Sequence, residues 1–272
     1  MRTPIAVTIA GSDSSGGAGI QADLKTFAAF GVYGASVITA LTAQNTRGVK
    51  AIQDVPPDFI AAQMDAVFSD LAVGAVKIGM LSQPAVIAAV AAGLDRHDQT
   101  DVVLDPVMVA ASGDRLLVPE AVDVLRRELI PRALVITPNL PEAAALLDTA
   151  PATNEGEMRD QVERLLALGP RAVLIKGGHS DAPESVDIFF DGTVELRLPA
   201  PRIDTNNTHG TGCTLSSAIA AGLAKGLKLV EAIAEAKAYV TLAIAGADRL
   251  TIGSGHGPVH HFHALWKEGA AQ

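Results

Sequence analysis

Short aliphatic and β-branched runs alternate along this chain with longer amphipathic segments, and this alternation restricts the fold more than any other feature. The predicted strands are Ile5–Ala10, Ala35–Ala40, Ala75–Ile78, Val102–Leu104, Leu134–Ile136 and Ala172–Ile175. The predicted helices are Ala18–Phe30, Pro57–Ser69, Gln83–His97, Pro119–Leu129, Pro141–Leu147 and Glu155–Leu168. Strands that alternate with helices usually pair in parallel and are buried on both faces. We therefore predict an α/β fold in which helices cover both faces of a mainly parallel sheet.

The last third of the chain has a different pattern. Val186–Phe190 and Thr193–Leu198 flank Asp191-Gly192, which is typical of a hairpin, and we expect it to close one edge of the sheet. Two further helices are predicted over Thr211–Lys225 and Leu229–Ala247. Because no linker, low-complexity tract or internal repeat interrupts residues 1–272, we expect a single domain.

Composition limits the class of protein. Of the 272 residues, 49% are hydrophobic and only 4% are aromatic, so a large core must be built from Ala, Val, Leu and Ile. The formal net charge of −9 argues against nucleic acid and against anionic membrane surfaces as partners. One cysteine excludes an intrachain disulfide, and no apolar run approaches the roughly 20 residues that span a bilayer. These features lead us to expect a cytoplasmic protein.

Glycines and unusual polar residues follow most of the predicted strands. They are Gly11 to Gly19, Gln44-Asn45, Gly79-Met80, Asp105, Asn139 and Lys176-Gly177-Gly178-His179. Ligands of open parallel sheets bind beyond the carboxyl ends of the strands. We therefore expect these residues to line one crevice.

The segment Asn207-Thr208-His209-Gly210-Thr211-Gly212-Cys213 leads into a predicted helix and is the most informative motif of the chain. Its glycines permit a tight turn and a close approach to a ligand. The first turn of a helix presents unpaired N–H groups, which stabilise anions. The same dipole would favour the thiolate form of Cys213, the only cysteine. The motif therefore indicates chemistry on phosphate.

The glycine-rich turn Gly11–Gly19 follows a strand and opens a helix, as in dinucleotide-binding proteins. However, the strict G-x-G-x-x-G spacing is missing, and no acidic residue ends the next strand at Asn45. These departures favour a tight structural connection over a dinucleotide site. The chain also contains no G-x-x-x-x-G-K-[ST] motif, which excludes a P-loop protein.

Three charged residues at strand ends each allow two interpretations. Lys176, which precedes two glycines, is either a surface lysine at a turn or a phosphate contact. Glu142 either belongs to a capped helix start in Asn139-Leu-Pro-Glu142 or lies near metal-bound phosphates. Asp105, before Pro106, either ends a strand or serves as a carboxylate of a metal or phosphate site.

The cysteine and histidine residues also leave alternatives. Cys213 is either a small buried side chain or the nucleophile of a Cys–His hydrolase with His209 or His179 as its base. The run His260-His261-Phe262-His263 resembles a metal cluster, but no further cysteine or acidic ligand follows at suitable spacing, which favours a structural C-terminal segment.

Taken together, the motifs resemble the hydroxymethylpyrimidine/phosphomethylpyrimidine kinase family of thiamine biosynthesis, within the ribokinase-like superfamily, nearly from end to end. The segments that carry the resemblance are Ala10–Asp13, Gly16–Thr26, Ser36–Asn45, Lys77–Met80, Asp105–Met108, Thr137–Ala143, Lys176–His179, Asn207–Cys213 and Gly257–His263. The resemblance implies a three-layer α/β/α kinase domain with a small edge hairpin, ATP and Mg²⁺ as cofactors, and a homodimer. One departure is Ser14, where the family often has proline, and we expect it to loosen the first loop.

The resemblance implies an acceptor site for an aminopyrimidine. Gln44, Asp23 and Gly11 would hydrogen-bond the pyrimidine, while Met80 and Val107 would line its ring. A pyrimidine edge offers adjacent donor and acceptor atoms, which a side-chain amide can match with its own pair.

The resemblance also implies a nucleotide site. Lys176 would contact the phosphates of ATP, and Asp105 and Glu142 would support magnesium. Asn139 and Thr208 would lie along the nucleotide.

Gly210, Thr211 and Gly212 would donate backbone N–H groups to the transferred phosphoryl group, and Cys213 would face the acceptor. Related sugar kinases are expected to carry aspartate where this chain has Cys213. A thiolate there would accept the proton of a hydroxymethyl group, whereas an acceptor that already carries a phosphate needs no such base.

Three other functions remain open from the sequence. A pyridoxal-type kinase would use the same fold and the same cysteine-bearing loop, although Gln44 favours a pyrimidine. A non-catalytic sensor of a vitamin precursor would not need Lys176 together with the Gly210–Cys213 segment. The third alternative is the Cys–His hydrolase.

Overall fold

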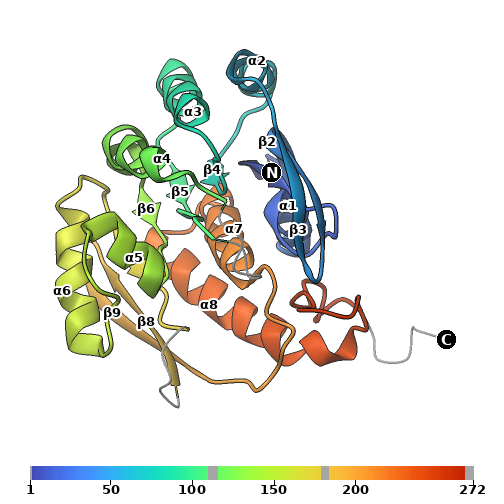
Figure 1. Ribbon diagram of the computed structural model, residues 1–272, viewed down its shortest axis with the longest axis vertical. Coiled ribbons are helices and arrows are strands. Elements are labelled where there is room, and N and C mark those ends of the chain that lie inside the picture. Colours follow the sequence, from blue (N-terminus) through green and yellow to red (C-terminus); the bar gives the residue numbers. More distant parts are fainter. Residues whose placement is uncertain (1, 110–115, 179–183, 267–272) are drawn as a thin grey trace.

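A computed structural model describes residues 2–109, 116–178 and 184–266, which places the predicted site residue His179 outside the described residues. In these ranges the strands form one sheet of order β3-β2-β1-β4-β5-β6-β7-β8-β9 (Figure 1). The strands are β1 (Ile5–Ser12), β2 (Tyr33–Asn45), β3 (Gly48–Asp54), β4 (Ala75–Ile78), β5 (Val102–Leu104), β6 (Val135–Ile136), β7 (Val173–Ile175), β8 (Glu184–Phe190) and β9 (Glu195–Pro201). The strands β2, β1, β4, β5, β6 and β7, in this order across the sheet, pair in parallel. At the edges, β3 pairs antiparallel with β2, and β8 pairs antiparallel with β7 and with β9.

The helices follow the predicted segments closely. They are α1 (Gly19–Ala29), α2 (Pro57–Phe68), α3 (Pro84–Arg96), α4 (Pro119–Val124), α5 (Leu140–Leu147), α6 (Glu155–Leu166), α7 (Thr211–Ala224) and α8 (Leu229–Ala245), with short turns at Leu125–Leu129, Ile130–Arg132 and Ala247–Arg249. The predicted helix Pro119–Leu129 is α-helical only as far as Val124 and continues as one π-helical turn. Pro131 lies two residues after the end of this turn at Leu129. Because proline lacks the N–H group that an α-helix needs, the helix does not continue.

Two hydrophobic cores lie on opposite faces of the sheet. One joins the sheet to α2, α3, α5 and α6, for example through Ile60, Val90 and Val162. The other joins it to α1, α7 and α8 through residues such as Phe27 and Ile219. This arrangement confirms the predicted three-layer α/β/α architecture, and most of the core side chains are aliphatic, as the composition requires.

The two antiparallel edges differ in how well the sequence predicts them. The hairpin of β8 and β9 forms as expected, because the Asp191 carboxylate accepts hydrogen bonds from the N–H groups of Thr193 and Val194 in the turn. The strand β3 at the opposite edge was not predicted, and β2 is longer than Ala35–Ala40. Because most side chains of β3 are exposed, the strand lacks the apolar alternation that identifies strands.

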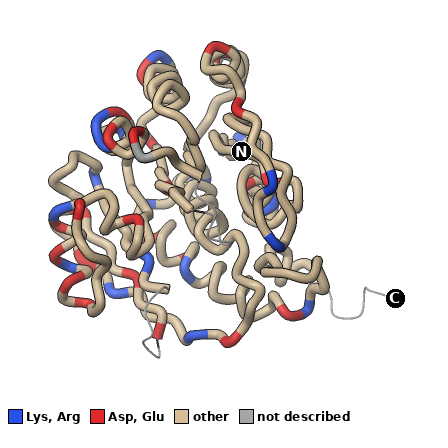
Figure 2. Tube along the Cα trace, in the orientation of Figure 1, with Lys and Arg blue, Asp and Glu red and all other residues tan. Residues whose placement is uncertain are grey.

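Both signs of charge are mixed along the outer helices, as along α6 (Figure 2). In one ion pair, however, both side chains are completely enclosed by the protein. The Lys77 ammonium on β4 contacts both carboxylate oxygens of Asp23 on α1, at 2.9 and 2.8 Å, and both side chains are fully buried. Because buried charges are costly unless they are paired, this contact fixes α1 against the sheet.

We expect Lys77→Met to lower the free energy of unfolding by about 3–5 kcal/mol, since it leaves the Asp23 carboxylate buried without its cation. Adding Asp23→Asn should recover part of the loss, because the amide carries no charge and still accepts hydrogen bonds. Urea denaturation near pH 7 measures both effects.

The control is Arg96→Met, which breaks the exposed ion pair between Arg96 and Asp65. Solvent and salt screen such a pair, so the loss should be much smaller. Equal losses for Lys77→Met and Arg96→Met would contradict this account of the buried pair.

Candidate functional site

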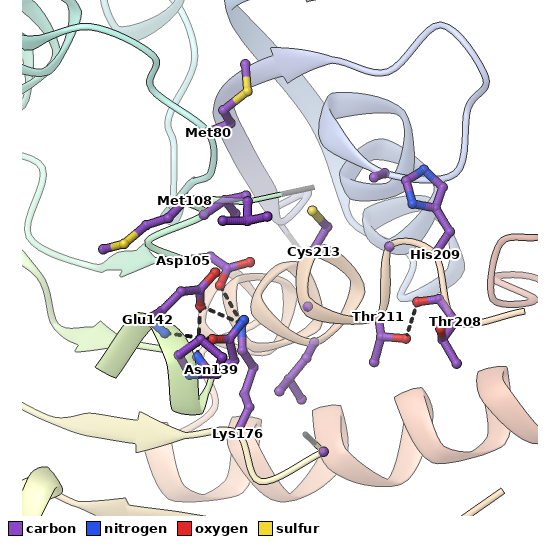
Figure 3. Close-up of a pocket in the computed structure, with 18 of the residues that line it drawn as sticks. Met80, Asp105, Met108, Asn139, Glu142, Lys176, Thr208, His209, Thr211 and Cys213 are labelled. Carbon is purple, nitrogen blue, oxygen red and sulfur yellow. Dashed lines mark hydrogen bonds and ion pairs between the residues drawn. The ribbon is translucent and has the colours of Figure 1, made fainter. Parts of the chain in front are cut away.

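A cavity of about 1120 Å³ opens at the carboxyl ends of the parallel strands, where α5 and α7 begin (Figure 3). Its lining includes all the predicted site residues except Asp23, namely Gly11, Gln44, Met80, Asp105, Val107, Asn139, Glu142, Lys176, Thr208, Gly210, Thr211, Gly212 and Cys213. Each strand end that was predicted to reach the crevice contributes to this lining, although Asn45, Gly79 and Gly177 are not part of it.

Asn139 and Glu142 form a reciprocal cap at the start of α5. The Asn139 Oδ1 atom accepts a hydrogen bond from the Glu142 N–H group at 2.8 Å, and Glu142 Oε2 accepts one from the Asn139 N–H group at 2.8 Å. This capping box follows from the sequence pattern and holds both side chains in fixed positions at the cavity wall. The structural and the functional interpretations of Glu142 are thus compatible.

A cation and two carboxylates meet beside this cap. The Lys176 ammonium lies 2.6 Å from Asp105 Oδ1 and 3.9 Å from Glu142 Oε2. Burial raises the pKa of Glu142 to about 7; the Lys176 charge opposes this shift, and the Asp105 charge adds to it. Burial alone would lower the pKa of Lys176, but the two carboxylates raise it, so the lysine stays cationic.

Gly177 and Asp187 fix the position of Lys176. A Cβ atom at Gly177 would overlap the carbonyl oxygen of Val186, so only glycine lets β8 approach this closely. The Gly177 N–H group donates to Asp187 Oδ1 at 3.0 Å, and Lys237 pairs with the same carboxylate at 2.7 Å. The backbone after Lys176 is therefore anchored to the edge hairpin.

The glycine-bearing turn before α7 approaches both the first loop and the charged cluster. Gly210 has φ +80°, and a Cβ atom there would overlap the carbonyl oxygen of Gly17. A Cβ at Gly212 would lie 3.1 Å from the Lys176 ammonium nitrogen and 3.5 Å from Asp105 Oδ2. We call Gly210–Gly212 the phosphate cradle, because the N-terminal N–H groups of α7 lie next to a cation here.

The structure corrects the expected ionisation of Cys213. The thiol is part of the cavity lining but is largely enclosed by protein, and this burial raises its pKa to about 11, against the opposing effect of the Lys77 charge. The helix dipole therefore does not produce a thiolate near neutral pH. The desolvation of the sulfur and the nearby carboxylates of Asp23 and Asp105 outweigh it.

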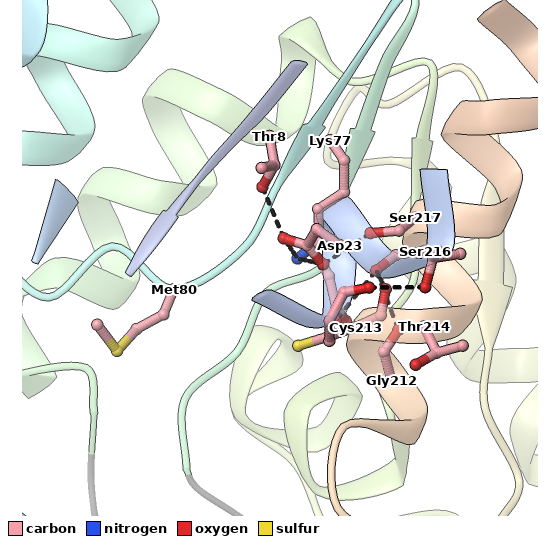
Figure 4. Close-up of polar contacts among 12 residues, drawn as sticks. Thr8, Asp23, Lys77, Met80, Gly212, Cys213, Thr214, Ser216 and Ser217 are labelled. Carbon is pink, nitrogen blue, oxygen red and sulfur yellow. Dashed lines mark hydrogen bonds and ion pairs between the residues drawn. The ribbon is translucent and has the colours of Figure 1, made fainter. Parts of the chain in front are cut away.

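Asp23 lies inside the protein and not at the cavity, unlike the expectation from the sequence (Figure 4). Its side chain is fully buried, and its carboxylate accepts hydrogen bonds from Lys77, Thr8 Oγ1 at 2.6 Å and Ser217 Oγ at 2.7 Å. These internal partners occupy the carboxylate, and Asp23 does not line the cavity. At the second turn of α1 the Asp23 carboxylate is turned toward the sheet, so the structure gives it a structural role and does not support the expected hydrogen bond to a pyrimidine.

Ser14 does not loosen the first loop as expected. Its Oγ atom accepts a hydrogen bond from the Gln44 N–H group and donates one to the Gln44 carbonyl oxygen, both at 2.9 Å. Thr42 Oγ1 donates to Gln44 Oε1 at 3.2 Å. The loop is therefore bound to the end of β2, and the Gln44 amide is held at the cavity.

The sequence pattern gave no role to Asp13, and it offered His209 only as the base of a Cys–His hydrolase. The contact between the two residues is found in the structure. The Asp13 carboxylate is buried, and the His209 Nε2–H group donates to Asp13 Oδ2 at 2.8 Å. Burial alone would raise the pKa of Asp13, but hydrogen bonds from His209, Ser15 and backbone N–H groups lower it to about 2. The His209 hydrogen bond thus goes to Asp13, which weakens its interpretation as the base of a Cys–His hydrolase.

The C-terminal histidines have structural contacts. His260 and His261 are buried, and His261 Nε2 lies 3.1 Å from Thr214 Oγ1 on α7. Among the described residues, no group of three or more histidine, cysteine or acidic side chains is placed to hold a metal. The structural interpretation of this segment fits these contacts.

The chain matches known proteins over almost its whole length. A family model described as phosphomethylpyrimidine kinase matches residues 13–260. The hydroxymethylpyrimidine/phosphomethylpyrimidine kinase of Rhizobium meliloti is 64% identical over 98% of this chain and 100% of its own. That of Escherichia coli is 57% identical over 96% and 98%.

Solved structures agree with the sequence matches. An ADP complex of Bacillus subtilis pyridoxal kinase has a TM-score of 0.90 and 38% identity over 98% of this chain and 100% of its own. A phosphomethylpyrimidine kinase from Clostridium difficile has a TM-score of 0.79 and 48% identity over 88% and 99%. No helix in the described ranges is long and apolar enough to cross a membrane.

The fold and the matched kinases define a phosphotransferase of the ribokinase-like class, in whose cavity the Gly210–Gly212 turn lies beside a lysine and two carboxylates. The sequence matches narrow this class further. The chain belongs to the phosphomethylpyrimidine kinase family.

The shifted pKa of Asp13 predicts a pH dependence of stability. The folded-state pKa of about 2 lies below the ordinary value of 3.8, so the ionised carboxylate stabilises the fold above that value and this contribution is lost as the pH falls toward 2. We expect Asp13→Asn to lower the free energy of unfolding by about 2 kcal/mol near pH 7, and by about half as much near pH 3. Urea denaturation at several pH values measures the difference. A difference that grows as the pH falls would contradict the prediction.

Proposed function

We propose that this protein transfers the γ-phosphoryl group of ATP to 4-amino-5-hydroxymethyl-2-methylpyrimidine, and then a second phosphoryl group to the monophosphate, in thiamine diphosphate biosynthesis. The observation that carries the proposal is the continuity of the cavity from Gln44 past Cys213 to Lys176. The acceptor end of the cavity, the phosphate cradle and the charged cluster of Lys176, Asp105 and Glu142 then adjoin one another, which is the arrangement that phosphoryl transfer requires.

On the acceptor side, Gln44 offers its amide to the pyrimidine edge, and Met80 and Val107 pack against the ring. Gly11 contributes by its small size, because a Cβ atom there would overlap the methyl carbon of Met80. The missing Cβ lets the Met80 side chain pack directly against the Gly11 backbone on this side of the cavity. Asp23 supports this side only through Lys77 and α1.

On the nucleotide side, Lys176 binds the phosphates of ATP, and Asn139 and Thr208 lie along the nucleotide. Asp105 and Glu142 would hold Mg²⁺, which supplies positive charge to the phosphates when it is bound. The residues fit this ion, because Mg²⁺ takes oxygen ligands and is commonly held by one or two carboxylates together with substrate phosphates. A nearby cation would also favour ionisation of Glu142, whose pKa burial raises to about 7.

In the cradle, the N–H groups of Gly210, Thr211 and Gly212 stabilise charge on the transferred phosphoryl group. Cys213 faces the acceptor as a neutral thiol, as its raised pKa requires. Because the transition state is loose, positioning and charge stabilisation contribute more than base strength. A neutral side chain admits both the hydroxymethyl compound and its monophosphate, whose phosphate is mostly dianionic at neutral pH.

We also propose that the whole chain acts as one domain and forms a homodimer in the cytoplasm. The nine-stranded sheet that joins the described residues supports one domain, and the family resemblance supports the dimer. The single cysteine supports a reducing compartment. The mass of the protein in solution, measured by sedimentation, tests the dimer.

The activity is tested by incubating the protein with Mg-ATP and the hydroxymethylpyrimidine, and following the products by mass. We expect the monophosphate and then the diphosphate. Lys176→Ala should lower kcat by about 100-fold or more, because it removes charge that stabilises the transition state. Arrest at the monophosphate, with pyridoxal turned over as well or better, would favour the pyridoxal-type kinase, to which the similar structures lend weight. No turnover of either compound would favour a sensor.

The role of Cys213 predicts a selective defect. Cys213→Asp should keep part of the first phosphorylation and lose the second, because like charges 4 Å apart repel by about 4 kcal/mol at an effective dielectric constant of about 20. Cys213→Asn is the matched control, since it has nearly the same shape without the charge. Separate rates for the two acceptors measure the effect, and an equal loss of both steps in Cys213→Asp would contradict it.

A further inference from the structure

The loop after β1 and the phosphate cradle meet at one buried contact. His209, which directly precedes the cradle, donates from Nε2 to Asp13 Oδ2 at 2.8 Å, across 196 residues of sequence. Only 7% of His209 and 2% of Asp13 are exposed. Figure 3 shows the His209 ring directed toward the first loop, on the side of the cavity away from Asp105 and Lys176.

Asp13 organises the whole first loop around this contact. Its Oδ1 atom accepts hydrogen bonds from Ser15 N–H and Ser15 Oγ at 2.9 and 2.7 Å. Its Oδ2 atom accepts bonds from the N–H groups of Gly17 and Ala18, at 3.1 and 2.8 Å, in addition to that from His209. Displacement of the carboxylate would therefore move the loop, and displacement of the loop would move His209.

The backbone leaves the two loops little freedom to move independently. A Cβ atom at Gly17 would overlap the His209 ring, and one at Gly210 would overlap the Gly17 carbonyl oxygen. On its other side, the His209 N–H group donates to the Gly257 carbonyl oxygen at 3.0 Å, and the His209 carbonyl oxygen accepts from Val259 at 3.2 Å. The residue before the cradle is thus held between the first loop and the C-terminal segment.

The same loop reaches the acceptor side of the cavity. Ser14, the neighbour of Asp13, exchanges two hydrogen bonds with the backbone of Gln44. One continuous set of contacts therefore runs from Gln44 through Ser14 and Asp13 to His209 and the cradle.

We propose that Asp13 and His209 are positioning residues, which set the phosphate cradle at its working distance from the acceptor. Both line the cavity, but the hydrogen bonds of the Asp13 carboxylate go to the first loop and to His209, so we assign the pair a positioning role and not a catalytic one. The proposal rests on the proposed kinase function. Since misplacement of reacting groups by about 1 Å can cost about 100-fold in rate, a small shift of the cradle is sufficient. The ionised state of Asp13 at neutral pH supports a lasting contact with His209.

The first test compares His209→Leu with His209→Gln. Leucine fills the space but cannot donate, whereas the glutamine amide can donate to Asp13 from nearly the position of Nε2. We expect His209→Leu to lower kcat by about 10- to 100-fold, with the KM values for the hydroxymethylpyrimidine and for ATP changed less than about 3-fold. His209→Gln should recover most of the rate, and Asp13→Asn should show the same kcat-dominated defect as His209→Leu.

Two controls separate positioning from loss of structure. His256→Leu changes an exposed histidine of the same C-terminal segment, and its kcat should equal that of the unmodified protein. Ser15→Ala removes one hydrogen bond to Asp13 Oδ1 but leaves the His209 contact, so its effect on kcat should be small. All rates are compared at a temperature where circular dichroism shows the variants folded. If His209→Leu does not fold, Asp13→Asn and His209→Gln carry the comparison.

Hydrogen exchange of the unliganded protein supplies a readout that does not depend on the proposed activity. In Asp13→Asn, the amides of residues 14–18 and 208–213 should exchange faster together, and by a larger factor than the amides of α3 and α6, which respond only to the loss of global stability. Unchanged exchange in residues 208–213 would overturn the proposal, even if the unmodified protein phosphorylates no pyrimidine. A normal kcat in His209→Leu would also overturn it. So would a lower melting temperature in His209→Leu and Asp13→Asn with no change in their kcat.

Discussion

The ion pair between Lys176 and Asp105 is the contact on which the geometry of the site depends. It joins the ends of β7 and β5, and Glu142 reaches it from the start of α5. These elements come together because parallel strands deliver their carboxyl ends to the same edge of the sheet. A cation enclosed by two carboxylates is stable there only while the surrounding backbone is held rigidly. Gly177 with Asp187 on one side, and the capping box of α5 on the other, provide that rigidity.

Burial decides which charges this site carries. A helix N-terminus favours an anion, yet the pKa of Cys213 at such a position is raised, because desolvation of the sulfur exceeds the opposing effect of the Lys77 charge. Lys77, beneath it, stays cationic because Asp23 accompanies it. The interior therefore supplies a balanced ion pair close to the acceptor side. Lys176 supplies a positive charge beside the cradle, at Gly212.

The cradle has its place because glycine contacts fit two distant loops together. Gly17 and Gly210 approach each other more closely than residues with a Cβ atom could. Asp13 and His209 then add a directional contact to this steric fit. In this way the first and the last thirds of the sequence form one wall of the cavity, and the acceptor side and the phosphate side share a common support.

The sequence by itself determined the layered α/β architecture and brought the predicted site residues other than Asp23 to one cavity, because hydrophobic period and strand-end position are local properties of the chain. It could not reveal β3, whose exposed side chains carry no apolar alternation. Only the tertiary structure decided that Asp23 is enclosed by Lys77, Thr8 and Ser217, that Cys213 stays protonated, and that Ser14 binds Gln44. Each of these depends on desolvation or on hydrogen bonds between residues far apart in the chain. Such quantities are fixed only when the elements pack together.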